Sequence, residues 1–203
     1  MVDPVALAAF VPAALALNLT PGADMMFCLG QGARSGPKAA WLASAGISTG
    51  GMIHVLLAGL GLSAVVASVP IALEVIRWVG VGYLLWLAWQ ALSRKDRIDA
   101  GPVIAGKQAF RAGLLVNLTN PKVILFVLAF VPQFVVPEAG NVLFQFIIFG
   151  AVIGVGGFFV NGLVGVFAGS VGQRLARGSR VLDWLTAGIF ATLAGRLALL
   201  EKS

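Results

Sequence analysis

Charged residues are scarce in this chain. Only 11% of its 203 residues are Asp, Glu, Lys or Arg, whereas 59% are hydrophobic, and the mean hydropathy is +0.97. Soluble domains carry about 25% charged residues, so this chain has too few to cover a surface that faces water. The scarcity therefore excludes an ordinary soluble protein. It predicts an all-α integral membrane protein, because a helix of ~20 apolar residues can span a bilayer.

Cysteine and histidine are almost absent. With one cysteine, Cys28, the chain can form neither an internal disulfide nor a Cys-x-x-Cys redox pair. With one histidine, His54, it lacks the cluster of imidazoles that transition metals prefer. It also lacks the Gly-rich phosphate loop of ATP-driven pumps and any catalytic constellation. We therefore expect no metal, no cofactor and no enzymatic activity. The net charge of +6 is assigned to cytoplasmic loops and lipid headgroups rather than to nucleic acid.

Long uncharged runs divide the chain into six predicted membrane-spanning helices. Two stretches of 35 residues, between Lys38 and Glu74 and between Glu138 and Arg174, contain no charge at all. The first apolar run follows MVDP, which lacks the positive charge of a signal peptide, so we count this run as a span. The predicted spans are 5–31, 40–66, 72–93, 111–136, 142–170 and 181–200. The hydrophilic stretch 94–109 separates the halves 1–93 and 110–203.

Lys and Arg gather in the loops after the first, third and fifth predicted spans. Because cytoplasmic loops carry the excess of positive charge, the sequence predicts that both termini face the periplasm and that 94–109 is a cytoplasmic linker. Ten of the fourteen basic residues support this orientation: Arg34, Lys38, Arg94, Lys95, Arg97, Lys107, Arg111, Arg174, Arg177 and Arg180.

The two halves carry the same motifs in the same order. The separation between copies is 99 residues at the first motif and 106 at the last. Because each half has three predicted spans, an odd number, the second copy must enter the membrane the opposite way round. We therefore predict two inverted three-helix repeats, an architecture typical of secondary transporters. The matching motifs are Asn18-Leu19-Thr20-Pro21 with Asn117-Leu118-Thr119-Asn120-Pro121, Gly46/Gly50 with Gly150/Gly154, and Trp78/Gly82 with Trp184/Gly188.

A proline interrupts the first and fourth predicted spans at matching places. Pro21-Gly22 and Asn120-Pro121 lie well inside their spans, where proline ends or kinks a helix. Thr20 and Asn120 are good N-cap residues, so each helix is expected to restart there. Two restarted helices that meet near the midplane would present free amides and positive dipole ends to a carboxylate. The alternative is a pair of packing kinks without a site.

Two opposite charges lie beside these breaks. Asp24 follows Pro21 by three residues, and Lys122 directly follows Pro121. A carboxylate deep in a span is costly unless it is paired, hydrated or protonated. We therefore predict that Asp24 binds a substrate ammonium or carries a coupling proton, rather than only stabilising the first turn of a helix. Lys122 either joins Asp24 in holding the two ends of a zwitterion or faces lipid, and both interpretations stay open.

Further polar residues complete the candidate site. His54 is either a proton relay or a hydrogen-bonded core residue. The paired glycines of the second and fifth spans are expected to be close-packing surfaces between helices. The candidate substrate and proton site consists of Thr20, Pro21, Gly22, Asp24, His54, Asn117, Asn120, Pro121 and Lys122, and the candidate cavity-lining residues are Asn18, Ser48, Thr49 and Asn161.

Longer motifs extend over most of the chain: NLTPGAD at 18–24, Gly36, the Gly46–Gly50–His54 spacing, GVGYLLWLAWQAL at 80–92 and FRAGLLVNLTNPKVILFVLAFVPQFV at 110–135. In these motifs the chain resembles the lysine exporter (LysE/RhtB) family of bacterial amino-acid exporters. That family commonly has Pro-Gly-Pro-Asp where this chain has Pro21-Gly22-Ala23-Asp24, a difference that bears on the geometry of the break. The resemblance implies six spans in the bacterial inner membrane, efflux of amino acids or their derivatives driven by the proton gradient, and a homodimer.

Together these features predict a secondary transporter that exports a small amino acid by proton-coupled alternating access around a midplane site. A single intramembrane carboxylate favours a neutral substrate over a cationic one. One alternative is a non-transporting membrane assembly module whose breaks only shape a docking surface. Another is metal or cation efflux, for which one histidine and one intramembrane carboxylate supply too few ligands. The expected partners are the amino acid, protons and membrane lipids.

Overall fold

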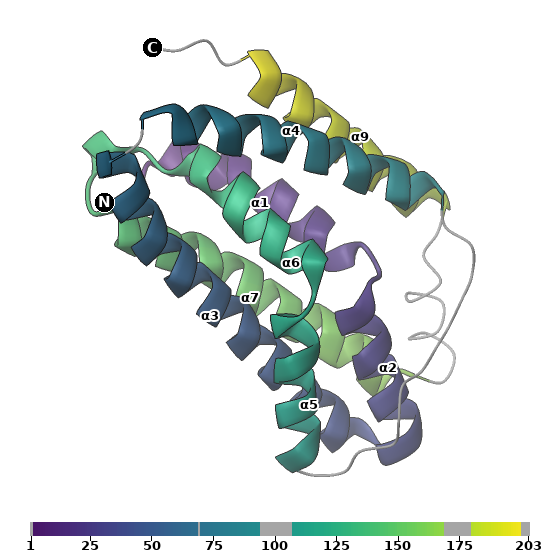
Figure 1. The fold of residues 1–203 in the computed structure, drawn as a ribbon. Coiled ribbons are helices and arrows are strands. Elements are labelled where there is room, and N and C mark those ends of the chain that lie inside the picture. Colours follow the sequence, from purple (N-terminus) through teal and green to yellow (C-terminus); the bar gives the residue numbers. More distant parts are fainter. Residues whose placement is uncertain (1, 69, 94–106, 169–179, 200–203) are drawn as a thin grey trace.

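The structure is a computed structural model that describes residues 2–68, 70–93, 107–168 and 180–199. Within these ranges all regular secondary structure is helical, and the helices form one bundle (Figure 1). Most of the predicted linker 94–109 lies outside the described residues, as do Arg174 and Arg177.

The first bent pair consists of α1 (Pro4–Leu19) and α2 (Ala23–Ser35). Asp3 caps α1, because its carboxylate accepts a hydrogen bond from the Ala6 N–H at 2.7 Å. Pro21 has no N–H with which to continue the helix, so α1 ends at Leu19 and α2 starts after a short extended segment, bent by 51°. This break lies where the sequence predicts it.

The second bent pair starts with α5 (Lys107–Leu118), which is followed by α6 (Pro121–Leu125), the π-helical segment η1 (Phe126–Phe130) and the 3-10 segment η2 (Val131–Phe134). The bend between Gln108–Leu118 and Pro121–Phe134 is 53°. It lies at Pro121, again as the sequence predicts. The two pairs run in opposite directions through the bundle (Figure 1). A 3-10 turn, η3 (Pro137–Ala139), then leads towards the next long helix.

Two long helices, α3 (Pro37–Ser68) and α7 (Val142–Val166), pack against each other and against the bent pairs. The expected close-packing role is confirmed for Gly46, Gly50 and Gly150, whereas a Cβ added at Gly154 would make only ordinary contacts. A Cβ added at Gly150 would lie 2.6 Å from Cγ1 of Val55, and one added at Gly46 would collide with the carbonyl oxygen of Phe110. Small residues at these positions allow helix backbones to approach closely.

A second layer is formed by α4 (Pro70–Leu92) and α9 (Arg180–Leu199), which lie side by side and antiparallel across α1 and α6 (Figure 1). A cluster of aromatic rings holds the layers together. Phe10 of α1 is fully buried, with its ring centroid 4.7 Å from that of Phe149 and 5.1 Å from that of Phe134. Leu84 of α4 and Phe190 of α9 complete the same buried cluster.

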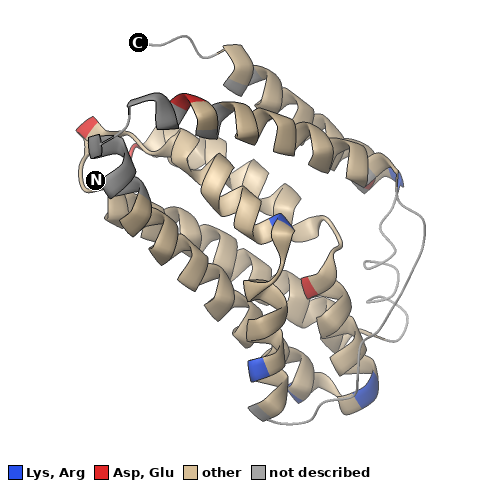
Figure 2. Cartoon of the chain, viewed as in Figure 1, with Lys and Arg blue, Asp and Glu red and all other residues tan. Residues whose placement is uncertain are grey.

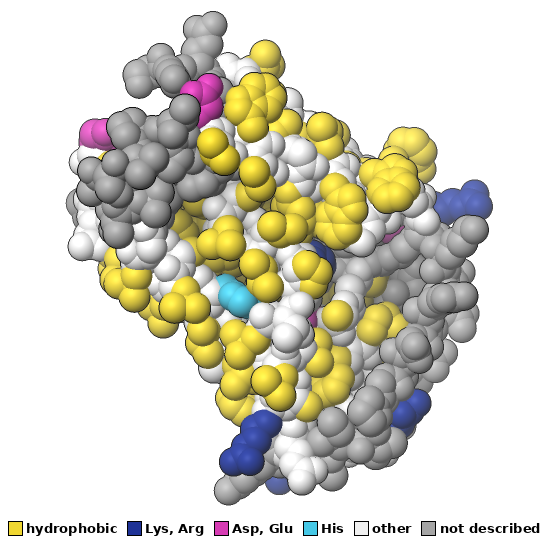
Figure 3. Space-filling model, viewed as in Figure 1, with side chains coloured by type: hydrophobic (Ala, Val, Ile, Leu, Met, Phe, Trp, Pro, Cys, Tyr) yellow, Lys and Arg dark blue, Asp and Glu magenta, His cyan; other side chains and the backbone are white. Residues whose placement is uncertain are grey.

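The length and composition of each helix show whether it could cross a membrane. Pro37–Gly61 and Val142–Val166 are each long and apolar enough to cross a membrane, and each bent pair passes the same test when taken as one span. The described residues thus contain two such helices, or four candidate spans with the bent pairs. The predicted third and sixth spans, 72–93 and 181–200, coincide with the helices α4 and α9. Large apolar side chains are exposed over the bundle (Figure 3), as expected for a surface that faces lipid.

The charged residues that the structure describes are separated along the bundle (Figure 2). Arg34, Lys38 and Arg111 lie where α2 ends and where α3 and α5 begin. Acidic residues lie towards the opposite end, and charges of both signs lie in the middle of the bundle (Figure 2).

Candidate functional site

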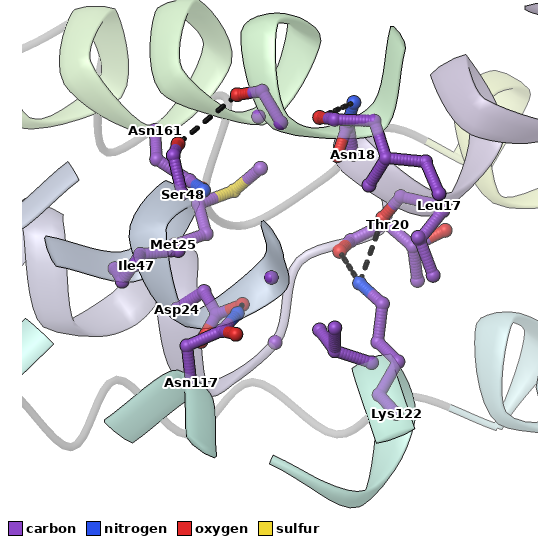
Figure 4. A pocket seen from close by; sticks show the side chains of 16 residues that line it. Leu17, Asn18, Thr20, Asp24, Met25, Ile47, Ser48, Asn117, Lys122 and Asn161 are labelled. Carbon is purple, nitrogen blue, oxygen red and sulfur yellow. Dashed lines mark hydrogen bonds between the residues drawn. The ribbon is translucent and has the colours of Figure 1, made fainter. Parts of the chain in front are cut away.

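The two helix breaks meet around one cavity near the middle of the bundle (Figure 4). Its volume is about 40 Å³, which is room for about three water molecules. Both bent pairs and both long helices contribute to its wall. The lining residues are Leu17, Asn18, Thr20, Gly22, Asp24, Met25, Ile47, Ser48, Gly51, Asn117, Lys122, Val123, Ile153, Gly154, Gly157 and Asn161.

Asp24, in the first turn of α2, extends towards the end of α5. Its Oδ2 accepts a hydrogen bond of 2.8 Å from Nδ2 of Asn117. The other oxygen of each side chain, Oδ1 of Asp24 and Oδ1 of Asn117, is buried without a hydrogen-bond partner among the described residues. A buried acceptor without a donor costs about 1–3 kcal/mol, and more when it is charged. Two residues that line the cavity therefore each hold one buried acceptor that lacks a donor.

Lys122, in the first turn of α6, extends in the opposite direction, towards the end of α1 (Figure 4). Its ammonium donates to the carbonyl oxygens of Leu17 at 2.8 Å and Thr20 at 2.6 Å. The last carbonyls of a helix have no intrahelical partner and carry the negative end of its dipole, so a cation is stabilised there. Lys122 is among the residues that line the cavity.

The N-termini of the two restarted helices differ. Asn120 caps α6 as predicted, its Oδ1 accepting from the Lys122 N–H at 3.0 Å. The prediction for Thr20 is wrong. Thr20 ends α1 instead, because its hydroxyl donates back to the Ala16 carbonyl, and the N-cap of α2 is Gly22, which provides no side-chain cap. The N-terminus of α2 is thus left open beside Lys122, since a Cβ added at Gly22 would lie 3.5 Å from Nζ of Lys122.

Three of the four candidate cavity-lining residues line this cavity, and each comes from a different helix. Asn18 of α1 donates to the Ile153 carbonyl at 3.1 Å, Ser48 of α3 donates to the Gly154 carbonyl at 3.0 Å, and the side chain of Asn161 in α7 is buried. Thr49 does not reach the cavity. Its hydroxyl donates to the Ala45 carbonyl of its own helix, and its side chain lines a separate groove on the outside of α3 and α7.

The remaining candidate residues lie close to the cavity without lining it. Pro21, Asn120 and Pro121 shape the two breaks. His54 is partly exposed on the surface (Figure 3), and its Nε2 lies 3.3 Å from the backbone carbonyl oxygen of Asn117. Asn117 thus lies between His54 and Asp24. Its backbone carbonyl contacts the histidine, and its side chain binds the carboxylate.

Tyr83 is a neighbour of the site that the sequence analysis did not single out. It lies in α4, and its hydroxyl donates to the Lys122 carbonyl at 2.5 Å. That carbonyl lies in α6, one turn before the π-helical segment η1, and such segments are frequent at functional sites. A signal was available, because Tyr83 is the one tyrosine of the chain and lies in an apolar span, where its hydroxyl needs a partner.

A metal site does not emerge from this geometry. Within residues 2–68, 70–93, 107–168 and 180–199, no three His, Cys, Asp or Glu side chains lie close enough together to hold a metal ion. The cavity presents one carboxylate, several amides and one ammonium. That set of groups suits a small molecule with both a positive and a negative end.

Two known proteins that resemble this chain are named as efflux proteins. The chain is 30% identical to the leucine efflux protein of Enterobacter sp. (strain 638) over 200 residues, 95% of this chain and 94% of that protein. It is 32% identical to the homoserine/homoserine lactone efflux protein of Salmonella typhi over 163 residues, 79% of this chain and 77% of that protein. No solved structure matches the chain. The family model of the LysE type translocators matches residues 15–201, and the chain therefore belongs to that family of membrane proteins.

Proposed function

We propose that this protein exports small neutral amino acids from the cytoplasm, and that the cavity between the two helix breaks is its substrate site. The observation that carries the proposal is the pair of buried, unpartnered acceptors, Asp24 Oδ1 and Asn117 Oδ1, on two residues that line one cavity. An α-ammonium has three N–H donors and a positive charge, so it satisfies both acceptors and neutralises the carboxylate. The efflux of leucine and of homoserine by the named relatives supports an amino acid as the substrate.

The carboxylate of the substrate has a complementary place on the other side of the cavity. The N-terminus of α2 is not capped by a side chain, and Lys122 lies beside it. Amides at a helix N-terminus and an ammonium group both bind carboxylates. Binding there would draw Lys122 away from the carbonyls of Leu17 and Thr20, and so would release the end of α1.

Proton coupling is assigned to Asp24 because it is the one acidic side chain that lines the cavity. In this proposal a proton and the substrate ammonium use the same carboxylate at different stages of the cycle, so that inward movement of protons drives export. His54, whose Nε2 contacts the Asn117 carbonyl, is in this proposal a second group close to the site that can hold a proton.

Alternating access follows from the way the breaks hold each other. Each break bonds to the opposite bent pair, through Asp24 with Asn117 and through Lys122 with Leu17 and Thr20. We propose that the two pairs belong to inverted three-helix repeats, with α4 and α9 as the third and sixth spans, and that they rock against each other. The similar bends and opposite directions of the pairs support this arrangement. The position of the basic residues supports periplasmic termini in the inner membrane.

The test is export from proteoliposomes loaded with labelled leucine, with and without an imposed pH gradient. We expect the wild-type protein to export leucine faster with the gradient. Asp24→Asn should still fold, but should reduce the export rate to the leak rate of leucine-loaded liposomes without protein. Glu138→Gln, which removes an exposed carboxylate, is the matched control and should export normally. Wild-type export by Asp24→Asn would contradict the mechanism. No export by the wild-type protein would favour the assembly-module alternative.

A further inference from the structure

An apolar groove runs along the outside of α3 and α7, next to the substrate cavity. Its volume is about 450 Å³, compared with about 40 Å³ for the cavity between the breaks. None of its lining residues is charged: they are Ser48, Thr49 and Met52 of α3, with Ala151, Gly154, Val155, Phe158 and Phe159 of α7.

The cavity and the groove share part of their walls. Ser48 and Gly154 line both of them, and the Ser48 hydroxyl donates to the Gly154 carbonyl at 3.0 Å. Gly154 contributes no side chain to this shared wall. A Cβ added there would lie 3.7 Å from the sulfur of Met52, an ordinary van der Waals distance. One hydrogen-bonded contact therefore separates the polar cavity from the apolar groove.

The cavity is too small for a whole amino acid of medium size. An apolar cavity of about 150 Å³ holds a benzene ring, and the cavity between the breaks offers less than a third of that volume. Its polar groups suit the ammonium and the carboxylate, which leaves the side chain of the substrate to be placed elsewhere. The groove is the adjoining space of sufficient volume.

The polar groups of the groove are already occupied. The Ser48 hydroxyl donates to Gly154, and the Thr49 hydroxyl donates to Ala45. Among the described residues, no charged side chain lines the groove to bind a charged substrate side chain. A charged side chain would lose its hydration there without compensation, whereas an aliphatic one would gain by leaving water.

We propose that the groove binds the aliphatic side chain of the transported amino acid, and that Ser48 and Gly154 form the passage through which it is reached from the cavity. This inference rests on the proposed function, because the ammonium must be held at Asp24 for the side chain to point towards Gly154. The size of the residue at 154 then sets the largest side chain that is exported.

The test compares leucine with alanine in the same proteoliposomes. Gly154→Val should lower leucine export relative to alanine export by about tenfold or more, because discrimination by one methylene is already worth about tenfold. Gly154→Ala should have a smaller effect of the same sign. Gly61→Val is the matched control, because Gly61 is exposed on α3 with nothing within 4 Å of an added Cβ. It should leave both rates unchanged.

A second measurement does not depend on transport. Thr49→Cys places a thiol in the groove, and the chain's own Cys28 is fully buried. In lipid nanodiscs, leucine should slow the labelling of this thiol by a maleimide, and glycine should not. Equal loss of leucine and alanine export in Gly154→Val, or labelling that leucine does not slow, would overturn the inference and leave the groove to lipid chains. If the wild-type protein exports neither leucine nor alanine, the proposed function is wrong, and so is the inference that rests on it.

Discussion

The two proline breaks have similar backbones and opposite chemistry. Both helices bend by about the same angle, 51° at Pro21 and 53° at Pro121. After Pro21 the chain has a carboxylate and an uncapped helix start, and after Pro121 it has an ammonium and a helix start capped by Asn120. A shared backbone geometry thus forms two complementary half-sites. In the proposed function one half-site binds the positive end of the substrate and the other its negative end.

The first prediction separates the roles of the two charges in stability. Lys122→Met should lower the free energy of unfolding by about 2–4 kcal/mol, because two carbonyls at the end of α1 lose a charged donor. Asp24→Asn should leave it unchanged or raise it, because an asparagine oxygen still accepts from Asn117 and no buried charge remains. Thermal unfolding in detergent measures both. Lys38→Met, which removes an exposed cation, is the control. Equal losses in the Lys122 and Asp24 variants would contradict the distinction.

The second prediction concerns how each broken helix is packed. α5 lies against α3 through backbone contact, because a Cβ at Gly46 would collide with the Phe110 carbonyl. α1 lies against α7 through a side chain, because a Cβ at Gly157 would lie 3.1 Å from Oδ1 of Asn18. Gly46→Ala should therefore destabilise by about 1–3 kcal/mol, and Gly157→Ala by clearly less, since a side chain moves more easily than a backbone. Unfolding temperatures of the two variants give the comparison, and the reverse order would contradict this account.

The third prediction compares the two helix starts and has the smallest effect. Asn120→Ala should cost about 1 kcal/mol by removing the cap of α6, and Asn120→Ser should restore most of it. Gly22→Ala removes no side-chain cap, and its added Cβ makes only ordinary contacts, so stability should change little. Its effect should appear in transport instead, because the methyl group fills the space beside Lys122 where we place the substrate carboxylate. A normal apparent affinity in Gly22→Ala would argue against that placement.

Local sequence signals predicted the helices and their breaks well, because these features depend on neighbouring residues. The helices break at Pro21 and Pro121, although Pro12 is accommodated inside α1, and Asn120 caps the helix that follows it. The same reasoning failed at Thr20, which has the composition of an N-cap but bonds backwards to Ala16. The N-cap of α2 is Gly22, which the composition of the segment did not indicate.

The sequence alone determined that this chain lies in a membrane, where its helices break and which charges lie beside the breaks, since composition and proline chemistry act locally. Only the tertiary structure decided which groups meet: Asp24 with Asn117, Lys122 with the end of α1, and Tyr83 with the Lys122 carbonyl. These contacts join residues that lie far apart along the chain, and they depend on the relative positions of packed helices. The two unpartnered oxygens at the cavity, on which the proposed function rests, became visible only once every other polar partner had been placed.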